Sequence, residues 1–406
     1  MSVSERWLLP DGVDELLPPE AWAVEKMRRS MLDAYAHYGY ELVSPPLIEY
    51  IESLLTGTGN DLDLQTFKVT DQLTGRMMGV RADITPQVAR IDAHLLKNTG
   101  ISRLCYADTV LHTRPAHTMT NRSPLQIGCE LFGEAGASAD IEIISLMLNT
   151  LELAGVKKIH IDLAHVGIYR GLLESSNMSK DLEAQLFDAL SRKSLPDLDA
   201  LAISVENGTN PLGKKDSVII RLVRDIANLS GGIEALDHIK SRVEQLDLSL
   251  PSVVKAIDEL KAITLQIQKR FSAVHIGFDF CELRGYNYHT GILFSAFSTN
   301  FGHALAKGGR YNDIGKDFGE SRPATGFSAD LKTLVRLAEK TNRETSTNLA
   351  GILAPAGDDE ALLKAISELR QTYRVVQQLN DHDVSENYHC DKRLVLEDNR
   401  WQIKDM

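Results

Sequence analysis

A segment with helical periodicity, from about residue 168 to residue 271, separates two sets of strand-like segments and constrains the fold more than any other feature. Strand-like runs precede it at 104–113, 125–133 and 158–164 and follow it at 273–280 and 292–298. Strictly alternating strands and helices are typical of a parallel, doubly wound sheet, whereas runs of strands broken by a block of helices favour an antiparallel sheet. We therefore predict an α+β fold with a helical insertion.

Local signals place further elements around this framework. The predicted elements are a helix that ends at Gly39, a hairpin over 67–81, a helix over 85–96 with Thr85 as its N-cap residue, and a closing helix over 326–338. Near the C-terminal end, residues 341–348 contain no apolar side chain, which is typical of a linker. We predict a core over 1–340 and a small α/β domain over 349–406, with a hairpin turn at Asp398 and Asn399.

The composition is that of an acidic globular protein. Lys and Arg number 44 against 56 Asp and Glu, a formal net charge of −12, which argues against binding that depends on neutralising many phosphates. The four cysteines form no C-x-x-C pair, as expected in a reducing cytoplasm, and the sequence indicates no metal site. No apolar run approaches the roughly 18 residues that cross a bilayer. We expect a cytoplasmic protein without membrane contact.

Polar side chains concentrate in segments 81–85, 126–133 and 284–289, the last followed by Gly-Gly-Arg-Tyr at 308–311. Alternation along 125–132 places Gln126, Gly128, Glu130 and Phe132 on one face, where Gly128 would leave space for a small ligand. A free amino acid needs an anion for its ammonium group, a cation or N–H for its carboxylate, and partners for its side chain, and these segments supply each type. Arg310 suits either bracing the pocket loop or contacting a carboxylate.

Over about residues 5–338 the sequence resembles the class II aminoacyl-tRNA synthetases of the histidyl type. The segments that carry the resemblance are LPDG at 9–12 with the helix into 39–41, RADIT at 81–85 (R-P-E-G-T in the family), QIGCELFG at 126–133 (Q-x-G-x-E-x-F-G), RGYNYH at 284–289 (R-G-L-D-Y-Y) and KGGRYN at 307–312 (A-G-G-R-Y-D). The resemblance implies that Asp83, Thr85 and Gln126 hold the α-amino group of histidine and that Glu130 receives its imidazole. The remaining residues of the implied histidine site are Arg284, Tyr288, His289 and Tyr311.

Two motifs depart from the family pattern. His112 stands where the family has an arginine that grips the α-phosphate of ATP, unless a one-residue gap promotes Arg114 to that role. Thr333 replaces the arginine of the third motif. Losing one preorganised group of this kind commonly costs about 3 to 4 kcal/mol of transition-state stabilisation, so we predict no aminoacylation and no catalytic residues.

A histidine site without these arginines resembles one branch in particular, the regulatory subunits of ATP phosphoribosyltransferase. The resemblance implies a non-catalytic protein without a cofactor, which activates a short-form catalytic subunit and transmits feedback inhibition by L-histidine in the first step of histidine biosynthesis. It also implies a self-dimer within a hetero-octamer that binds no tRNA. Two alternatives are a histidine-tRNA ligase with degenerate ATP motifs and a stand-alone amino-acid-binding module.

Overall fold

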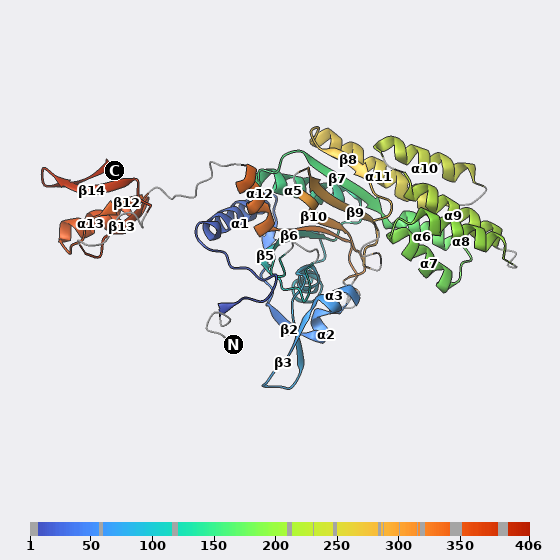
Figure 1. Ribbon diagram of the computed structural model, residues 1–406, viewed down its shortest axis with the longest axis horizontal. Coiled ribbons are helices and arrows are strands. Elements are labelled where there is room, and N and C mark those ends of the chain that lie inside the picture. The colour runs from blue at the N-terminus through green and yellow to red at the C-terminus, as the bar shows by residue number, and fades with distance from the viewer. Residues whose placement is uncertain are drawn as a thin grey trace. The chain divides into compact units, whose positions relative to one another are not determined.

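The computed structural model contains three sheets in the part of the chain that it describes (Figure 1). The described residues are 7–56, 60–115, 121–208, 213–229, 231–246, 250–282, 286, 288–299, 301–314, 316, 321–341, 351–380 and 389–406. Within these ranges, no helix combines the length and the apolar character that crossing a bilayer requires.

Eight strands form the largest sheet, in the order β1–β5–β6–β11–β10–β9–β7–β8. Neighbouring strands are antiparallel except in the outermost pairs, β1–β5 and β7–β8, which are parallel. The strands are β1 (Glu41–Leu42), β5 (Ser102–Thr109), β6 (Leu125–Phe132), β7 (Ile159–His165), β8 (His275–Phe278), β9 (Ile292–Ser298), β10 (Phe301–Arg310) and β11 (Ala324–Asp330). The predicted α+β fold with a mainly antiparallel sheet is confirmed.

Long helices cover one face of this sheet. Tyr35 of α1 (Glu20–His37) packs edge-on against Phe327 of β11, with 6.2 Å between ring centroids, and its hydroxyl bonds Thr150 of α5 (Ala137–Leu153) at 3.0 Å. Helix α5 contacts both β6 and β11. Helices α1 and α5 therefore bury this face of the central strands.

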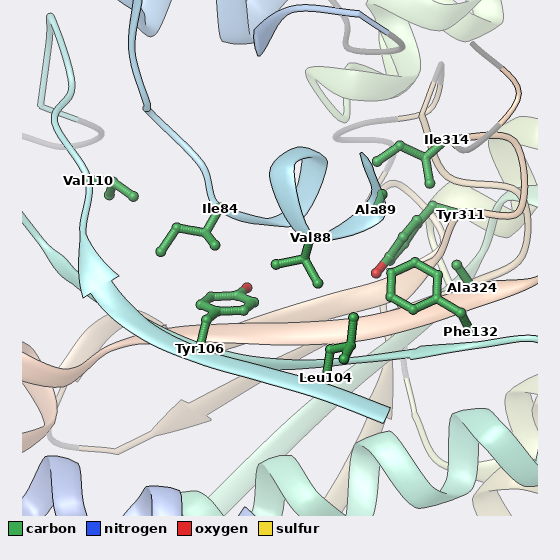
Figure 2. Close-up of a cluster of buried hydrophobic side chains, with 10 residues drawn as sticks. All are labelled: Ile84, Val88, Ala89, Leu104, Tyr106, Val110, Phe132, Tyr311, Ile314 and Ala324. Atoms are coloured by element: carbon green, nitrogen blue, oxygen red, sulfur yellow. The ribbon is translucent and has the colours of Figure 1, made fainter. Parts of the chain in front are cut away.

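The opposite face of β5 and β6 is covered by the short helix α4 (Thr85–Arg90), which continues into a π-helical turn, η2 (Ile91–Leu96). Figure 2 shows Val88 of α4 and the preceding Ile84 against Leu104 and Tyr106 of β5. The other elements of this layer are β2 (Ile48–Tyr50), β3 (Phe67–Thr70), β4 (Met77–Val80), α2 (Ile51–Leu54) and α3 (Asn60–Gln65). The β3–β4 pair confirms the predicted hairpin.

Helix α4 and the π-helical turn η2 differ from the predicted helix over 85–96 at its start and at its end. Ile84 holds the N-cap position without a side-chain cap, and Thr85 is the first helical residue. Asp83 accepts the Thr85 N–H at 3.1 Å and so takes the place of the predicted Thr85 cap, which frees the Thr85 hydroxyl for another partner. The predicted helix over 85–96 ends in this π-helical turn, where Leu95 and Leu96 are 62% and 44% exposed.

The predicted helical block follows β7 and consists of six helices in the described residues. They are α6 (Val166–Glu174), α7 (Lys180–Ser191), α8 (Leu195–Glu206), α9 (Gly213–Ala227), α10 (Ile233–Gln245) and α11 (Pro251–Arg270). Helix α11 contacts α6, α5 and β7 and returns the chain to β8 beside β7. The helical periodicity of 168–271 is confirmed, and the helices insert between two neighbouring strands of one sheet.

Two strands occupy segments that were predicted otherwise. Residues 326–330, expected to begin the closing helix, complete β11, and only residues from Leu331 onward form helix α12 (Leu331–Thr341). Strand β10 includes Gly308, Gly309 and Arg310, where a pocket loop was predicted from the sequence. Pairing with two neighbours decides both cases, because β11 bonds to β6 and to β10 along its length and this overrides the local helical spacing. Gly308 permits the close approach, since a Cβ there would collide with the Gly326 carbonyl oxygen.

The chain divides into two compact units, one with residues 1–16 and 24–341 and the other with residues 17–23 and 342–406. The second unit contains the sheet β13–β12–β14–β15, and Leu362 and Ile366 of its helix pack against that sheet. Its elements are β12 (Gly351–Ala354), α13 (Glu360–Leu369), β13 (Arg374–Gln377), β14 (Lys392–Glu397) and β15 (Arg400–Asp405). Asp398 and Asn399 have φ of 47° and 59°, which confirms the predicted two-residue hairpin turn. The division into core, linker and C-terminal domain stays a prediction, and residues 342–350 of the linker region lie outside the described residues.

Candidate functional site

A cavity of about 410 Å³ opens on the sheet face where α4 begins. Its volume lies in the range of small-molecule sites. The predicted site residues that line it are Asp83, Thr85, Glu130, Tyr288, His289 and Tyr311. Gln126 does not line this cavity but lines the adjoining one, and Arg284 lies outside the described residues. The structure therefore brings six of the eight predicted residues to one cavity.

Glu130 of β6 is the buried acid of this cavity, with an exposed fraction of 1%. The Thr85 hydroxyl donates to its Oε1 at 2.9 Å and the Tyr106 hydroxyl donates to the same oxygen at 3.0 Å. The Tyr311 hydroxyl donates to Oε2. Gly326, the register partner of Glu130 on β11, provides space for the carboxyl group, because a Cβ there would collide with Oε2.

Burial raises the pKa of Glu130 to about 8, and the nearby Asp83 adds to the rise, whereas the hydroxyl donors oppose it. None of the groups that shift this pKa is a cation. A buried carboxylate that has only neutral donors is stabilised strongly by a ligand that brings a positive charge or an N–H donor. An imidazole supplies both in its protonated form.

Asp83 and Gln126 form a hydrogen-bonded pair beside Glu130. Gln126 Nε2 donates to Asp83 Oδ1 at 2.8 Å, and Gln126 Oε1 accepts the Ile84 N–H at 2.9 Å. The Thr85 N–H also donates to Asp83 Oδ1, so these contacts leave Oδ2 of Asp83 to face a ligand. Gln126 thus orients the anion and does not line the cavity itself. The assignment of these residues to the α-amino group stays a prediction.

Aromatic rings form another wall of the cavity. Tyr288 stacks on Tyr311 with 5.2 Å between centroids and 25° between planes, and His289 meets Tyr311 edge-on at 6.4 Å. Burial lowers the pKa of His289 to about 4, so its ring is neutral near pH 7. The Tyr288 hydroxyl is buried and has no hydrogen-bond partner among the residues that the structure describes. An unpaired buried hydroxyl is costly, so its position in a cavity wall indicates a polar ligand atom at this point.

A second cavity of about 260 Å³ adjoins the first and shares Lys307 and Ser328 with it. His112 and Thr333, the two departures from the family motifs, both line this second cavity. His112 Nε2 bonds the Ala82 carbonyl oxygen at 2.9 Å, and the Thr333 hydroxyl donates to Asp330 at 2.6 Å. Arg114 is exposed and is not among the described residues that line either cavity.

The structure shows the partners of Arg310 within the chain and overturns the expectation for Gly128. Arg310 is 6% exposed and braces the site, because it pairs with Asp140 at 2.9 Å and donates to the carbonyl oxygens of Glu134 and Gly136. Gly128 leaves no space for a ligand, since the Tyr106 hydroxyl fills that position, 2.6 Å from where a Cβ would stand. In the described ranges, no set of three or more His, Cys, Asp or Glu side chains could hold a metal ion.

Tyr106, which donates a hydrogen bond to Glu130, is the main residue of this site that the sequence did not predict. Its alternation on β5 places it on the ligand face, but its value depends on register, because it lies directly opposite Gly128 of β6. A Tyr opposite a Gly on neighbouring strands is a usable signal only once the strand pairing is known.

The comparisons with known proteins agree with this geometry. The family profile described as histidyl-tRNA synthetase matches residues 12–334, and the profile described as ATP phosphoribosyltransferase subunit HisZ C-terminal domain matches residues 349–404. A solved structure described as an ATP phosphoribosyltransferase regulatory subunit/histidyl-tRNA synthetase from Bacillus halodurans aligns with a TM-score of 0.76 at 24% identity, over 95% of this chain and 97% of that one. The fold is therefore that of the class II, histidyl-tRNA synthetase-like proteins.

Individual relatives identify a narrower family within this class of proteins. An ATP phosphoribosyltransferase regulatory subunit from Marinobacter nauticus is 51% identical over 407 aligned residues, covering 100% of this chain and 99% of the relative. A second, from Ectopseudomonas mendocina, is 50% identical and covers 99% of each chain. The chain belongs to the family of ATP phosphoribosyltransferase regulatory subunits.

Proposed function

We propose that this chain assembles in the cytoplasm with a short-form ATP phosphoribosyltransferase catalytic subunit, activates it, and transmits inhibition by L-histidine to the first step of histidine biosynthesis. The observation that carries the proposal is the match to regulatory subunits over the full chain, including the segment 349–404. A solved complex described as ATP phosphoribosyl transferase (HisG:HisZ) from Thermotoga maritima contains a chain of the same fold, with a TM-score of 0.57 at 18% identity, which supports a catalytic partner. We infer a self-dimer within a hetero-octamer.

The cavity around Glu130 is the proposed histidine site. An imidazole at Glu130 meets a buried acid whose raised pKa suits sharing one proton with a ring of similar pKa. Asp83 Oδ2 is the anion for the ammonium group, and the unpartnered Tyr288 hydroxyl is a donor or acceptor for the remaining polar atoms. Inhibition requires that histidine bind one conformation of the complex more tightly than another, since a ligand shifts an equilibrium only through differential affinity.

We further propose that the chain has no adenylation activity of its own. The two positions at which the synthetase motifs carry arginines hold His112 and Thr333, whose described hydrogen bonds are to groups of the same chain. Of the described residues that line the second cavity, Lys307 is the one Lys or Arg side chain. A triphosphate needs several fixed cations in the transition state of adenylation.

Reconstitution tests the proposal. The purified chain is mixed with a short-form catalytic subunit, ATP and phosphoribosyl pyrophosphate, and phosphoribosyl-ATP formation is followed with and without L-histidine. We expect a faster rate than that of the catalytic subunit alone and a loss of that gain when histidine is added. An unchanged rate in both conditions would contradict the proposal, and light scattering of the mixture measures the expected octamer.

The alternative function, histidine-tRNA ligase, has its own assay. Histidine-dependent exchange of pyrophosphate into ATP reports adenylation without requiring tRNA. We expect no exchange above background from this chain at any histidine concentration. Exchange that saturates with histidine would establish the ligase activity and would assign the second cavity to ATP.

A further inference from the structure

Tyr106 lies behind the histidine site rather than on its surface. It is fully buried on β5, directly opposite Gly128 of β6, and it is not among the described residues that line the cavity. Its hydroxyl donates to Glu130 Oε1 at 3.0 Å and lies 3.3 Å from the Thr85 hydroxyl. The hydroxyls of Tyr106 and Thr85 therefore meet at the same oxygen of Glu130, and their single protons are both directed to it.

Gly128 provides the space that the Tyr106 hydroxyl occupies beside Glu130. A Cβ at Gly128 would stand 2.6 Å from the Tyr106 hydroxyl oxygen and 2.8 Å from the ring carbon that carries it. It would also collide with the Phe327 carbonyl oxygen on β11. Any larger residue at this position would displace the Tyr106 hydroxyl from Glu130.

The hydrogen bonds to Glu130 are divided unequally between its two oxygens. Oε1 accepts from two hydroxyls, those of Thr85 and Tyr106, and Oε2 accepts from that of Tyr311. In its ionised form Glu130 offers two lone-pair sites on each oxygen, so the described contacts fill Oε1 and leave one site on Oε2. A ligand N–H therefore has one acceptor position on this carboxylate, in one direction.

We propose that Tyr106, admitted by Gly128, is a positioning residue that fixes which oxygen of Glu130 meets the ligand and thereby selects one nitrogen of the imidazole ring. This inference rests on the proposed binding of histidine at Glu130. Without the Tyr106 hydroxyl, Oε1 regains a free acceptor site and the carboxylate gains rotational freedom. Discrimination between the two ring nitrogens then weakens together with affinity.

The test is calorimetry with Tyr106→Phe and three ligands, L-histidine and its two N-methylated forms, 1-methylhistidine and 3-methylhistidine. The wild-type chain should bind the two methylated forms with clearly different affinities, because only one of them keeps the selected N–H. Tyr106→Phe should bind L-histidine about ten-fold more weakly and should bring the ratio of the two methylated ligands at least three-fold closer to one.

Tyr35→Phe is the matched control, because Tyr35 is also fully buried in this unit and its hydroxyl bonds Thr150. It should leave the histidine affinity and the ratio unchanged, and thermal unfolding of both variants measures any loss of folding. If wild-type protein binds histidine but Tyr106→Phe changes neither affinity nor ratio, the inference is wrong and the proposed function stands. If wild-type protein binds no histidine, both are overturned.

Discussion

The two adjoining cavities differ in how their polar groups are satisfied. In the first, Glu130 is buried with only hydroxyl donors, and the Tyr288 hydroxyl has no partner among the described residues. In the second, Asp330 accepts the N–H groups of Leu125 and Lys332 and the hydroxyl of Thr333. The first is incomplete without a ligand, whereas the described polar groups of the second are largely paired within the chain.

This difference explains how a synthetase-like fold serves a binding function. Both cavities are built on the same strands, β10 and β11, and share Lys307 and Ser328. His112 and Thr333, which stand at the two arginine positions of the family motifs, line the second cavity and are not among the described residues that line the first. The proposed binding of an amino acid and its activation would therefore depend largely on different side chains, with Lys307 and Ser328 common to both cavities.

The largest effect is expected from Glu130→Ala. Removing this carboxylate takes away the anion of the first cavity and leaves three hydroxyl donors without their acceptor. L-histidine affinity measured by calorimetry should fall at least about 100-fold, while activation of the catalytic subunit should be largely retained.

Glu142→Ala is the control for this variant. Glu142 lies on helix α5, pairs with Arg103 of β5 and is not among the described residues that line either cavity. It should leave histidine affinity within about two-fold of wild type. Unchanged affinity in Glu130→Ala would remove the first cavity from consideration as the histidine site.

The second-largest effect is expected in the pH dependence of the free energy of unfolding. The pKa of Glu130 is about 8 in the folded protein against an ordinary value of 4.5, so the unfolded chain loses this proton at lower pH than the folded protein. Stability therefore falls as pH rises through this window. Relative to Glu130→Gln, which cannot ionise, the wild-type free energy of unfolding should fall by about 2 kcal/mol from about pH 5.5 to about pH 7.5 and should level off above about pH 8.

Urea unfolding of both proteins across this range measures the difference. Glu142→Gln provides the opposite sign, because hydrogen bonds from Arg103 and Tyr40 outweigh burial and hold the pKa of Glu142 below its ordinary value. The stability that Glu142 contributes is present above the ordinary pKa and is lost as pH falls below it. Parallel wild-type and Glu130→Gln curves would show that Glu130 is not destabilised by its burial.

The sequence predicted the framework well where local signals and tertiary pairing agreed. The helical block, the hairpin of β3 and β4 and the turn at Asp398 and Asn399 follow from periodicity and turn chemistry alone. It failed at 326–330, where spacing of Phe327 with Leu331 mimics a helix but pairing on both sides imposes a strand. Propensity is a weak guide for a central strand whose two neighbours come from distant segments.

For the site, residue types predicted the chemistry and not the division of roles. Six of the predicted residues line one cavity, which the family-like segments made foreseeable. Gln126, predicted to hold the ligand, bonds Asp83 and Ile84 with its amide and lines the second cavity, and its ligand role stays a prediction. Gly128 was expected to leave space, yet Tyr106 fills it. Both outcomes depend on which side chains face each other across strands, and one sequence does not specify that register.

A smaller effect is expected from Tyr288→Phe. This variant removes one buried hydroxyl that has no partner in the described structure, so the free protein should be as stable as wild type or slightly more stable. Histidine affinity should fall about ten-fold, because a ligand atom that pairs with this hydroxyl loses its partner.

Tyr169→Phe is a matched control, since Tyr169 in helix α6 also has a buried hydroxyl without a partner but lies outside the first cavity. It should leave histidine affinity unchanged. Equal affinities for wild type and Tyr288→Phe would mean that the unpaired hydroxyl does not face the bound ligand.

The smallest effect is expected from Thr333→Val in the second cavity. The variant removes a hydroxyl that donates to Asp330, but the N–H groups of Leu125 and Lys332 still hold that carboxylate. Histidine affinity should change less than about two-fold, whereas Thr85→Val, which removes the corresponding donor to Glu130, should weaken it about ten-fold. The two variants make the same chemical change beside two buried acids, so their difference measures how far the cavities act independently. A ten-fold loss in Thr333→Val would show that they form one ligand site, because Asp330 would then influence histidine through the shared wall at Lys307 and Ser328.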